Sequence, residues 1–367
     1  MIKILHVLAA LDGGGVECML KNYYENFDCE NIKFDFIVFE KGKGMLEEYF
    51  LSKGSKIFHI TPKKENFIKS NLELKKIIKN GQYDIIHCHQ NRSNIIPLYY
   101  AHKYKIKNRI CHSHSASIIK SFKEKMIKNV FSYYIEKYAT KLFACSNMAA
   151  KWLYSKKVQE KVTIINNAIE LKRFEYNSKI RNNIREKYKL DNKIVVGCVA
   201  RIHPQKNHKF LIDIFNELHK INSNYYLFLA GDGVDKELIE NKVKEYGLQN
   251  DVLFAGNCNN VNELLQAFDI FALPTLFEGL GISLIESQVS GLLTITSKDV
   301  VPEETNVTKQ IHYIPLEKTA KEWANEIELL YSKENERISY TDKIASQGFN
   351  IYNEANKLEK LYIDMVK

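Results

Sequence analysis

The stretch Phe277-Glu278-Gly279-Leu280-Gly281-Ile282-Ser283-Leu284-Ile285-Glu286 joins a glycine-rich turn to the start of an apolar helix. It follows Ile270–Leu273, a short apolar run that predicts a buried strand. A strand, a tight turn and a helix in this order are typical of an α/β fold, and open parallel sheets bind ligands where their strands end. Glycine lets backbone N–H groups approach an anion, and the two glutamates can accept hydrogen bonds from hydroxyls, so the stretch predicts a binding site.

The same alternation of apolar runs and longer amphipathic runs extends along the whole chain. Continuous apolar strands favour a parallel sheet covered by helices on both faces, so the pattern predicts a doubly wound α/β architecture. The expected strands are Lys3–Leu8, Phe34–Phe39, Lys56–Ile60, Ile85–His87, Asn108–His112, Leu142–Cys145, Val195–Ala200, Tyr226–Ala230, Val252–Ala255, Ile270–Leu273 and Leu292–Thr296.

The strand pattern runs twice, and 367 residues are too many for one ordinary core. Asn166-Asn167 favours a turn, and the charged segment Lys172–Asn192 has no clear core face, so we place the domain boundary there. The expected domains are residues 1–170 and 171–349. The last amphipathic run, Asn353–Val366, predicts a helix within residues 350–367.

The composition is that of a globular protein, with 45% hydrophobic and 26% charged residues. No apolar run reaches the roughly 18 residues of a membrane span. The opening Met1–Val7 indicates a buried strand rather than a signal peptide. The seven cysteines are odd in number and never spaced C-x-x-C, so a cytoplasmic location is expected rather than a disulfide or zinc framework.

The net charge of +9 is concentrated in residues 101–160, which hold 13 Lys or Arg against three Glu. A solvated basic face is one interpretation, and contact with a lipid surface or a phosphate-bearing acceptor is the other. Within this region, Lys120–Lys141 repeats aromatic residues and lysines at helical spacing. Such a helix could pack an apolar face on the core or lie at the inner face of the cell membrane.

Each glutamate of the opening stretch has an ordinary explanation by itself. Ser283-x-x-Glu286 matches a capping box that would tie down a helix start, and Glu278 could be a loop carboxylate. Their combination with the Gly279–Gly281 turn directly after a buried strand favours a site for a nucleotide diphosphate-sugar.

Two cations follow another expected strand. Arg201 comes directly after Val195–Ala200, and Lys206 lies five residues further on. Solvated loop charges are the ordinary explanation, but beside the glutamates the pair favours neutralisation of a diphosphate. For Gly231-Asp232, after the next strand, a plain turn and a role in lining a nucleotide pocket remain equally open.

A glycine loop, Asp12–Glu17, follows the first strand and opens a helix. It is not a complete dinucleotide fingerprint, because Cys18 occupies the place of the third glycine. A tight turn is one interpretation, and a loop whose Gly14 and Gly15 backbone meets an acceptor or a diphosphate is the favoured one.

Four histidines occur in two pairs, His87 with His89 and His112 with His114, each at the end of an expected strand. Alternate strand residues face the same way, so a pair could converge on a metal. One strand end normally offers only one or two groups, so a metal is not favoured. We expect His112 or His114 beside a bound sugar, and His87 and His89 as strand-end residues with satisfied hydrogen bonds.

Together these segments are similar to glycosyltransferase family 4, whose members adopt the GT-B fold. The similarity covers nearly the whole chain, and Phe277–Glu286 is its most specific part. The usual Pro-Asn-Gly hinge appears as Ile165-Asn166-Asn167, a departure from the family pattern. The other matching segments are Gly13–Glu17, Arg109–His114, Ala144–Ser146, Ile165–Ile169, Val199–Asn207, Leu229–Gly233 and Phe268–Phe271.

The resemblance implies two Rossmann-like domains facing across a cleft, the first binding the acceptor and the second the nucleotide-sugar, with the C-terminal helix packing back on the first. It also implies transfer with retention at the anomeric carbon. Its catalytic set would be His112, His114, Arg201, Lys206 and Glu278. Its nucleotide-sugar-binding set would be Gly14, Gly15, Arg201, Lys206, Gly231, Glu278, Gly279, Leu280, Gly281 and Glu286.

No two aspartates stand two positions apart, so the Asp-x-Asp metal motif is missing and neither a metal nor another cofactor is expected. The expected reaction moves a hexose or N-acetylhexosamine from a nucleotide diphosphate-sugar, most commonly a UDP-sugar, to a glycan or lipid-linked glycan in polysaccharide synthesis. The alternatives are an epimerase of the same fold and a non-catalytic sugar-nucleotide-binding protein. Nucleic-acid binding is not expected, because no nucleic-acid motif accompanies the basic region.

Overall fold

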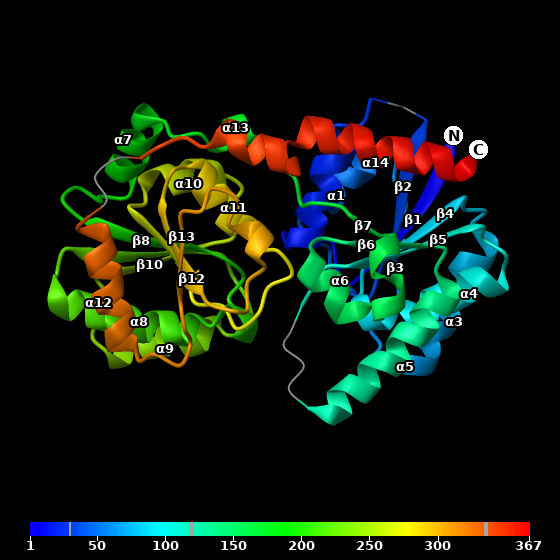
Figure 1. Cartoon of the computed structure of the whole chain (residues 1–367), viewed down its shortest axis with the longest axis horizontal. Coiled ribbons are helices and arrows are strands. Elements are labelled where there is room, and N and C mark those ends of the chain that lie inside the picture. The colour runs from blue at the N-terminus through cyan, green and yellow to red at the C-terminus, as the bar shows by residue number, and fades with distance from the viewer. Residues whose placement is uncertain (29–30, 117–120, 334–336) are drawn as a thin grey trace. The chain divides into compact units, whose positions relative to one another are not determined.

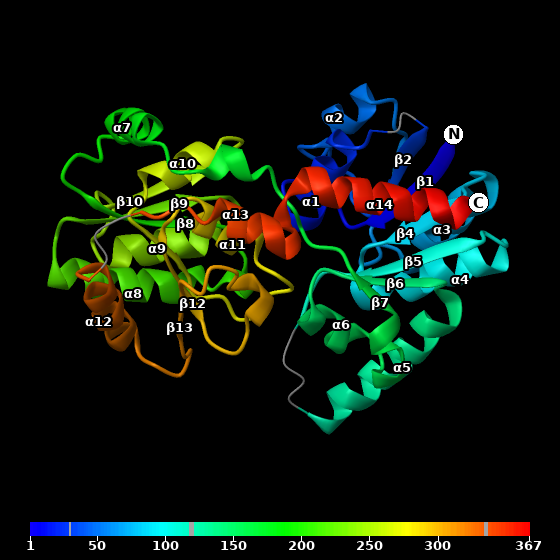
Figure 2. The same cartoon turned by 45° about the horizontal axis from the view of Figure 1, so that its top comes forward.

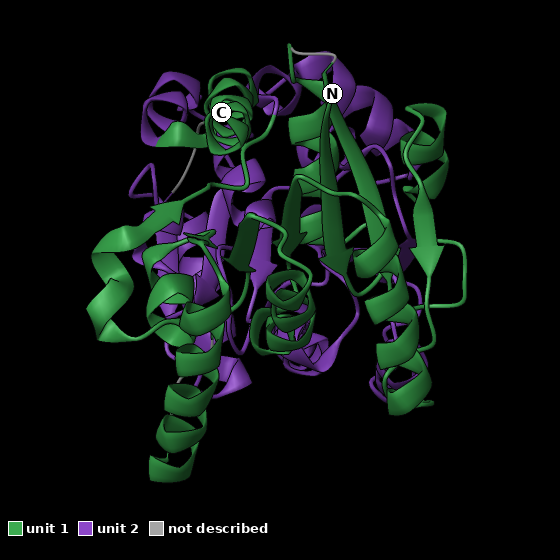
Figure 3. Cartoon of the chain, turned by 90° about the vertical axis from the view of Figure 1, so that its right-hand side faces the viewer, with its two compact units in different colours: residues 1–169, 348–367 green, residues 170–347 purple. Residues whose placement is uncertain are grey.

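The computed structural model describes residues 1–28, 31–116, 121–333 and 337–367, which form two compact units (Figure 1). Unit 1 comprises Met1–Ile169 and Gly348–Lys367, and unit 2 comprises Glu170–Gln347 (Figure 3). The domain limits expected from the sequence lie within two residues of these boundaries.

Unit 1 is built on a seven-stranded parallel sheet with the order β3-β2-β1-β4-β5-β6-β7. Six of its strands were expected. The edge strand β7 was not, because it is only three residues long and merges with the predicted turn. The strands are β1 (Ile2–Leu8), β2 (Ile32–Val38), β3 (Ile57–His59), β4 (Ile85–Cys88), β5 (Asn108–Ser113), β6 (Lys141–Ala144) and β7 (Val162–Ile164).

Helices cover both faces of this sheet. The C-terminal helix α14 lies beside α1 on one face, as both views show (Figures 1 and 2). Their shared core includes Ile4, Leu20, Phe34 and Tyr362. The helices are α1 (Gly15–Glu25), α2 (Glu47–Ser52), α3 (Phe67–Asn80), η1 (Asn91–Asn94), α4 (Ile95–Lys103), α5 (Phe122–Tyr138), α6 (Asn147–Leu153), η2 (Lys156–Lys161) and α14 (Ile351–Val366).

The return of the chain to unit 1 is fixed by backbone pairing. Ile169 forms an isolated parallel bridge with Asn350, and its N–H donates to the carbonyl of Phe349 over 3.0 Å. The Asn350 side chain then caps α14 by accepting from the N–H of Tyr352. The C-terminal helix therefore packs on the core of unit 1.

Unit 2 repeats the architecture with a six-stranded parallel sheet in the order β10-β9-β8-β11-β12-β13. The doubly wound α/β prediction is confirmed in both units. Only the short edge strand β13 was not expected. The strands are β8 (Ile194–Val199), β9 (Tyr225–Ala230), β10 (Val252–Gly256), β11 (Ile270–Leu273), β12 (Leu293–Ser297) and β13 (Ile311–Ile314).

The core of unit 2 is large and aromatic, with Phe215, Phe228, Phe268 and Trp323 fully buried. Burial of this kind on both faces accounts for the continuous apolar strands that the sequence displays. The helices are η3 (Leu171–Phe174), α7 (Ser178–Lys187), η4 (Pro204–Lys206), α8 (His208–Ile221), α9 (Lys236–Glu245), α10 (Val261–Ala267), α11 (Ile282–Val289), η5 (Glu303–Thr305), α12 (Ala320–Tyr331), α13 (Thr341–Ile344) and η6 (Ala345–Phe349), the last spanning the unit boundary.

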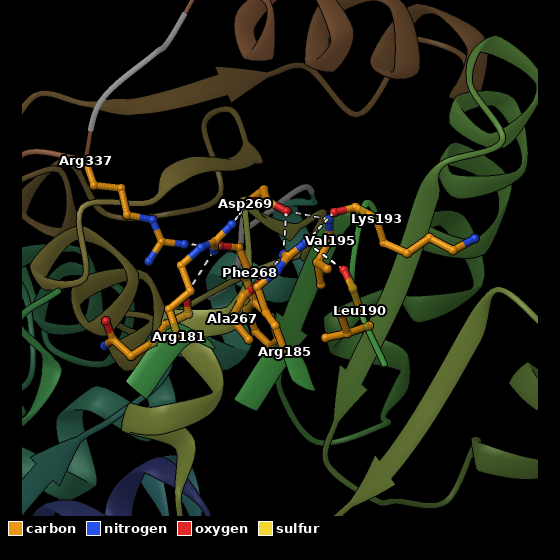
Figure 4. Close-up of polar contacts among 10 residues, drawn as sticks. Arg181, Arg185, Leu190, Lys193, Val195, Ala267, Phe268, Asp269 and Arg337 are labelled. Atoms are coloured by element: carbon orange, nitrogen blue, oxygen red, sulfur yellow. Dashed lines mark hydrogen bonds and ion pairs between the residues drawn. The ribbon is translucent and has the colours of Figure 1, made fainter. Parts of the chain in front are cut away.

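The interpretation of Lys172–Asn192 as a segment without a core face is wrong, because it contains α7. This helix is anchored largely by charge (Figure 4). Arg181 and Arg185 donate to the two carboxylate oxygens of Asp269 over 2.5 and 3.2 Å. Ile184 is the one buried residue of this helix, so an apolar pattern could not reveal it.

Asp269 lies at the amino end of β11, and its carboxylate also accepts from the N–H of Val195 in β8 over 2.7 Å. Arg181 and Arg337 donate to the carbonyl of Phe268. In a parallel sheet the amino ends of all strands lie at one edge. This polar cluster therefore reinforces the amino edge of the sheet, which is opposite to the carboxyl edge. It is therefore a structural feature, separate from the candidate site below.

Helix α5 agrees with the expected helical spacing, but only its second half packs inward, where Ser132 and Ile135 are buried. Its start is capped by Ser121 and Glu124, which satisfy each other's backbone N–H groups. Phe122, Met126 and Val130 are exposed. The part of the chain described by the structure contains no helix that is both long and apolar enough to cross a membrane.

Candidate active site

The carboxyl edge of the unit 2 sheet brings together residues that are 72 positions apart in the sequence. Lys206, at the end of η4, donates from Nζ to Oε1 of Glu278 over 2.7 Å. The two side chains are only 18% and 6% exposed, so the ion pair is shielded from water and holds both groups in a defined geometry. This contact joins the loop that carries Lys206 to the glutamate stretch.

Gln205 joins the two loops that carry this pair. Its side chain donates to the carbonyl of Phe277 over 2.8 Å. Its own carbonyl accepts from the N–H of Leu276 and from the hydroxyl of Thr275. Loops that share several hydrogen bonds hold their charged side chains in place, which is what preorganised electrostatic stabilisation needs.

The glycine turn determines where α11 begins. Gly281 has φ of 83°, a left-handed conformation that favours glycine, and it is the N-cap of α11 without a side-chain cap bond. Ser283 and Glu286 therefore lie inside the helix, and the capping-box interpretation is wrong. The turn leaves the amino end of an eight-residue helix near Glu278, with its partial positive charge available to an anion.

Glu286 is a partly buried carboxyl group on the second turn of α11. Although some of its surface is accessible, the loss of hydration raises its pKa from 4.5 to about 7. Its protonation state therefore changes near neutral pH. By contrast, Leu280 between the two glycines is buried, and its carbonyl accepts from Thr305, so it shapes the turn.

Arg201 and Gly231 lie at the same edge, on the segments that follow β8 and β9. Arg201 is exposed. Gly231 has φ of 142°, and a Cβ atom there would lie 2.1 Å from the carbonyl oxygen of Ala200. Gly231 is thus required for the close packing of these segments. The Asp232 carboxylate accepts from the N–H of Gly233 over 2.7 Å, which favours the turn interpretation of this residue.

The unit 1 glycine loop lies at the carboxyl end of β1. Gly14 is the N-cap of α1 and has an ordinary extended conformation. A Cβ atom on Gly14 would meet only the flexible carboxylate of Glu17, and one on Gly15 would have ordinary contacts. Local backbone geometry therefore does not require glycine at positions 14 and 15. Their place at the start of α1, which has no side-chain cap, is compatible with an anion-binding backbone.

The histidines of unit 1 form a larger cluster than the sequence suggested. They lie on the α1 and α14 face of the sheet, since His6 pairs in register with His87 and the others follow at alternate positions. Four are buried and His114 is partly exposed. The members are His6, His87, His89, His112 and His114.

Hydrogen bonds link these rings directly. His87 Nε2 lies 3.2 Å from His112 Nδ1, and His89 Nδ1 lies 2.8 Å from His114 Nε2. His87 Nδ1 also contacts the hydroxyl of Tyr362 in α14 over 2.8 Å. Burial lowers the pKa of all these rings, to about 3 for His114, because a charged imidazole would lose its hydration.

Two groups of three ring nitrogens are close enough to suggest a metal site. One nitrogen from each of His6, His87 and His89, or of His89, His112 and His114, lies within 4.8 Å of the others. Most of these nitrogens already have imidazole or hydroxyl partners, so hydrogen bonding accounts for their spacing. The expectation that the protein needs no metal stays a prediction.

Comparisons with known proteins agree with a chain of two α/β units. The family profile described as Glycosyl transferases group 1 matches residues 180–347, and the profile described as Glycosyltransferase Family 4 matches residues 13–173. EpsF of Bacillus subtilis (strain 168), which is named as a glycosyltransferase, is 30% identical over 332 residues, covering 89% of this chain and 86% of the relative. The chain belongs to glycosyltransferase family 4. It is therefore a glycosyltransferase, as its resemblance implied.

A second relative aligns with the entire chain. The Escherichia coli UDP-Gal:alpha-D-GlcNAc-diphosphoundecaprenol alpha-1,3-galactosyltransferase is 26% identical, over 100% of this chain and 97% of the relative. Among solved structures, Anabaena HepE in complex with UDP and glucose superposes with a TM-score of 0.80 at 16% identity, covering 98% of this chain and 99% of HepE. WaaG, a glycosyltransferase involved in lipopolysaccharide biosynthesis, gives a TM-score of 0.71 at 14% identity, with coverages of 98% and 99%. The fold of this glycosyltransferase is GT-B.

Three residues of these networks were not singled out from the sequence. Gln205 joins the site loops, His6 extends the histidine cluster, and Tyr362 closes one of its hydrogen-bond chains. The polar His6 within the apolar run Ile4–Leu8 was the available signal, because a buried polar residue needs a partner. Tyr362 gave no such signal, since it reads as an ordinary apolar-face residue of a helix.

Proposed function

We propose that this glycosyltransferase moves a hexose or N-acetylhexosamine from a UDP-sugar to a lipid-linked glycan, with retention at the anomeric carbon, during assembly of a bacterial polysaccharide. The observation that carries the proposal is the shielded Lys206–Glu278 pair beside the amino end of α11. The names of a relative and of a structural neighbour support it, since the first acts on a GlcNAc-diphosphoundecaprenol and the second is bound to UDP and glucose.

The difficult step is departure of the nucleoside diphosphate, because negative charge grows on the leaving oxygen as the glycosidic bond breaks. Lys206, Arg201 and the N–H groups at the start of α11 stabilise that charge. Lys206 is already held by Glu278, so it meets the diphosphate without a large loss of side-chain freedom.

The two glutamates have different tasks in this proposal. Glu278 accepts from hydroxyls of the donor sugar, and its pairing with Lys206 aligns sugar and diphosphate beside each other. Glu286 accepts from the ribose hydroxyls. Because its pKa is about 7, its carboxylate form, the stronger acceptor, is dominant only above neutral pH.

Unit 1 supplies the acceptor side. The glycine loop at Gly14 and Gly15 meets the acceptor or the diphosphate with its backbone, and His112 or His114 faces the sugar. Within the described residues, His112 Nε2 and His114 Nδ1 are buried atoms without a hydrogen-bond partner, so each chain of imidazoles ends in an open nitrogen. Contact with a substrate oxygen requires one of these nitrogens to become accessible when the substrate binds and to carry the ring proton.

A lipid-linked acceptor requires access to a membrane, and α5 is suited to that contact. Phe122, Met126, Val130 and Tyr133 repeat at intervals of four, four and three residues, which places them along one face of the helix, and all four are exposed. Exposed lysines at positions 123, 125 and 137 accompany them. An apolar stripe among lysines is typical of a helix that lies on an anionic lipid surface at the cytoplasmic face.

The proposal is tested by incubating the purified protein with a panel of labelled UDP-sugars and a synthetic undecaprenyl-diphosphate-linked sugar. We expect one UDP-hexose or UDP-N-acetylhexosamine to give an extended lipid-linked product whose new linkage has the donor's anomeric configuration by NMR. An inverted linkage would contradict retention. Conversion of the donor in the absence of acceptor would indicate an epimerase, and binding without any product would indicate a sugar-nucleotide-binding protein.

A further inference from the structure

Arg92 of unit 1 is held by aromatic rings rather than by an acid. It lies in η1, just after the carboxyl end of β4. Its Cζ lies 4.9 Å from the centre of the Trp152 ring in α6 and 5.8 Å from that of the Phe131 ring in α5. Among the described residues, its guanidinium has no hydrogen-bond or ion-pair partner. Stacking therefore orients the charge and leaves its N–H donors for another group.

Part of this guanidinium can be reached from solvent. Nε of Arg92 is buried, but the residue as a whole is partly exposed. Nη1 and Nη2 also lack partners among the described residues, and they are not among the buried atoms, so solvent reaches them. These outer nitrogens form the planar fork that matches the oxygens of a phosphate or a carboxylate.

Two lysines add positive charge beside Arg92. Lys128 lies on α5 one turn before Phe131, and its Nζ donates to the carbonyl of Lys151 in α6. An ammonium group has three donors, so this bond leaves others unused. Lys156 is exposed at the start of η2, which follows α6. Three elements of unit 1, namely η1, α5 and the α6–η2 segment, thus bring cations to one place.

Positive charge exceeds negative charge in this place. Burial lowers the pKa of Lys128, and the charges of Arg92 and Lys156 lower it further. Glu136 opposes them, and it is the one carboxylate of the described residues whose charge acts on Lys128. Its two oxygens already accept from the N–H and the hydroxyl of Ser155, over 2.7 and 2.9 Å. An anion from outside the chain would therefore offset a repulsion among these cations.

We propose that Arg92, Lys128 and Lys156 form a subsite for the phosphate groups of a polyprenyl-diphosphate acceptor, here named the phosphate subsite. It follows β4 at the carboxyl edge of a parallel sheet, where such sheets bind ligands. Helix α5 carries both a lysine of the subsite and the exposed apolar stripe, so a ligand that joins a diphosphate to a long apolar chain can contact both. The identity of the acceptor rests on the proposed function, whereas phosphate binding does not.

The chain has two tryptophans, which makes the phosphate subsite visible by NMR. Trp152 stacks against Arg92, whereas Trp323 is fully buried in unit 2 and donates from Nε1 to the carbonyl of Pro315 over 3.0 Å. Protein labelled with ¹⁵N-tryptophan is first given excess UDP to occupy the donor site, and is then titrated with farnesyl diphosphate. We expect a saturable shift of the Trp152 indole signal and none of the Trp323 signal. A Trp152 signal that does not move would overturn the inference.

Further probes identify the source of such a shift. Inorganic pyrophosphate should displace farnesyl diphosphate, and farnesol, which lacks phosphate, should leave the Trp152 signal unchanged. Short-chain phosphatidylglycerol should require at least about a tenfold higher concentration, since a phosphodiester carries less charge than a diphosphate. An equal shift with farnesol would indicate apolar contact and overturn the inference. Equal potency of phosphatidylglycerol would indicate a lipid headgroup and overturn the assignment to the acceptor.

Substitutions test the charges themselves. We expect Arg92→Gln and Lys128→Gln each to weaken farnesyl diphosphate binding about tenfold, the order of one hydrogen bond to a charged group. Arg92→Lys should lose less, because it keeps the charge without the fork. Lys157→Gln is the matched control, since Lys157 is an exposed lysine next to Lys156. Unaltered affinity in both glutamine variants of the subsite, or an equal loss in the control, would contradict the subsite.

Transfer assays separate failure of this inference from failure of the proposed function. With an undecaprenyl-diphosphate-linked acceptor, Arg92→Gln should raise the acceptor KM about tenfold and keep kcat within about twofold. Transfer with an unchanged acceptor KM would retain the proposed function and exclude the subsite. A saturable Trp152 shift without transfer to any polyprenyl-diphosphate acceptor would retain phosphate binding and exclude that acceptor.

Discussion

Lys206 and Glu278 illustrate how a single contact serves both stability and binding. Their ion pair is largely shielded from water, so each charge depends on the other for compensation. In the proposed reaction the ammonium group is shared between Glu278 and the diphosphate. The same closeness that stabilises the pair thus places a cation where the leaving group develops its charge.

Replacing Lys206 should affect catalysis and stability together. We expect Lys206→Ala to lower kcat/KM by roughly 30- to 1,000-fold, the effect of losing one preorganised donor at about 2–4 kcal/mol. We also expect a lower melting temperature, because Glu278 would stay buried without its partner. Lys209→Ala, an exposed lysine on the adjoining α8, is the control. Unchanged turnover in Lys206→Ala would remove this residue from the mechanism.

Glu286 should make donor binding depend on pH. Since its pKa is about 7, the carboxylate that accepts from the ribose is lost as pH falls through neutrality. We therefore expect the donor KM to rise between pH 8 and pH 6. Glu286→Gln should bind the donor more weakly at pH 8 and show a much smaller pH dependence. An identical pH profile in the variant would contradict the assignment.

The same residue should lower the stability of the folded protein at high pH. Its folded pKa is raised from 4.5 to about 7, so the folded state binds the proton more tightly, and stability decreases as pH rises through that window. At pH 8 we expect Glu286→Gln to be more stable than the unmodified protein by about 3 kcal/mol, the equivalent of the shift. Urea unfolding at pH 8 and pH 4 tests this, since the gain should disappear at the lower pH.

At the scale of elements, α7 shows that ion pairs can anchor a helix, and α5 shows that a helix can leave apolar side chains exposed. Helix α7 has few buried side chains and is held by arginines on Asp269, whereas α5 exposes much of its apolar surface. An amphipathic sequence pattern predicts that the apolar residues of a helix point inward. Helix α7 departs from that pattern because ion pairs anchor it. Helix α5 departs from it by exposing an apolar stripe, which suits a surface partner.

The anchoring of α7 can be tested by removing its central carboxylate. We expect Asp269→Asn to destabilise unit 2 by about 3 kcal/mol, because Arg181 and Arg185 would lose their charged partner in a poorly hydrated place. Thermal or urea unfolding measures this. Arg173→Ala is the control, since Arg173 forms only an exposed 3.8 Å pair with Glu170. Equal effects of the two substitutions would contradict the structural role of the cluster.

The exposed stripe of α5 predicts binding to anionic lipid. We expect Met126→Ser with Val130→Ser to reduce cosedimentation with phosphatidylglycerol vesicles at least about fivefold, since two apolar side chains no longer enter the interface. The control is Leu238→Ser on α9, because Leu238 is 54% exposed, compared with 56% for Met126 and 55% for Val130. Transfer to a water-soluble acceptor should not change in any of these variants. Unaltered vesicle binding by the α5 double variant would exclude this stripe as the membrane contact.

At the scale of the molecule, two parallel sheets repeat one architecture and place chemistry at their carboxyl edges. Unit 2 carries the cations, the carboxylates and a helix start, and unit 1 carries a glycine loop and the histidines. Each unit contains a complete core, so site residues can be replaced without removing the framework that positions them.

Transfer should not require a divalent metal. In the proposed mechanism Lys206, Arg201 and the amino end of α11 already stabilise the negative charge that develops on the leaving diphosphate. We expect the initial rate in excess EDTA to stay within about twofold of the untreated rate. Loss of turnover in EDTA that Mn²⁺ restores would contradict this. Repeating the measurement with Lys206→Ala shows whether a metal can replace the missing cation.

The sequence by itself determined the fold class, eleven of the thirteen strands, the glutamate stretch and the cation loop, because these depend on local patterns. Continuous apolar runs reveal buried strands, and glycines between charged residues reveal a turn at a strand end. The two strands it missed are short edges, where few residues are buried. Helix α7 was missed because its partner, Asp269, is more than 80 positions away.

Only the tertiary structure decided which groups meet. It paired Lys206 with Glu278 and brought His6 and Tyr362 to histidines on other strands. It also excluded a capping role for Glu286, because Gly281 is the N-cap of α11. Such contacts join residues far apart in the chain, and they follow from strand order and helix packing. A periodic pattern carries information about which face of an element is buried, but none about which neighbour that face will meet.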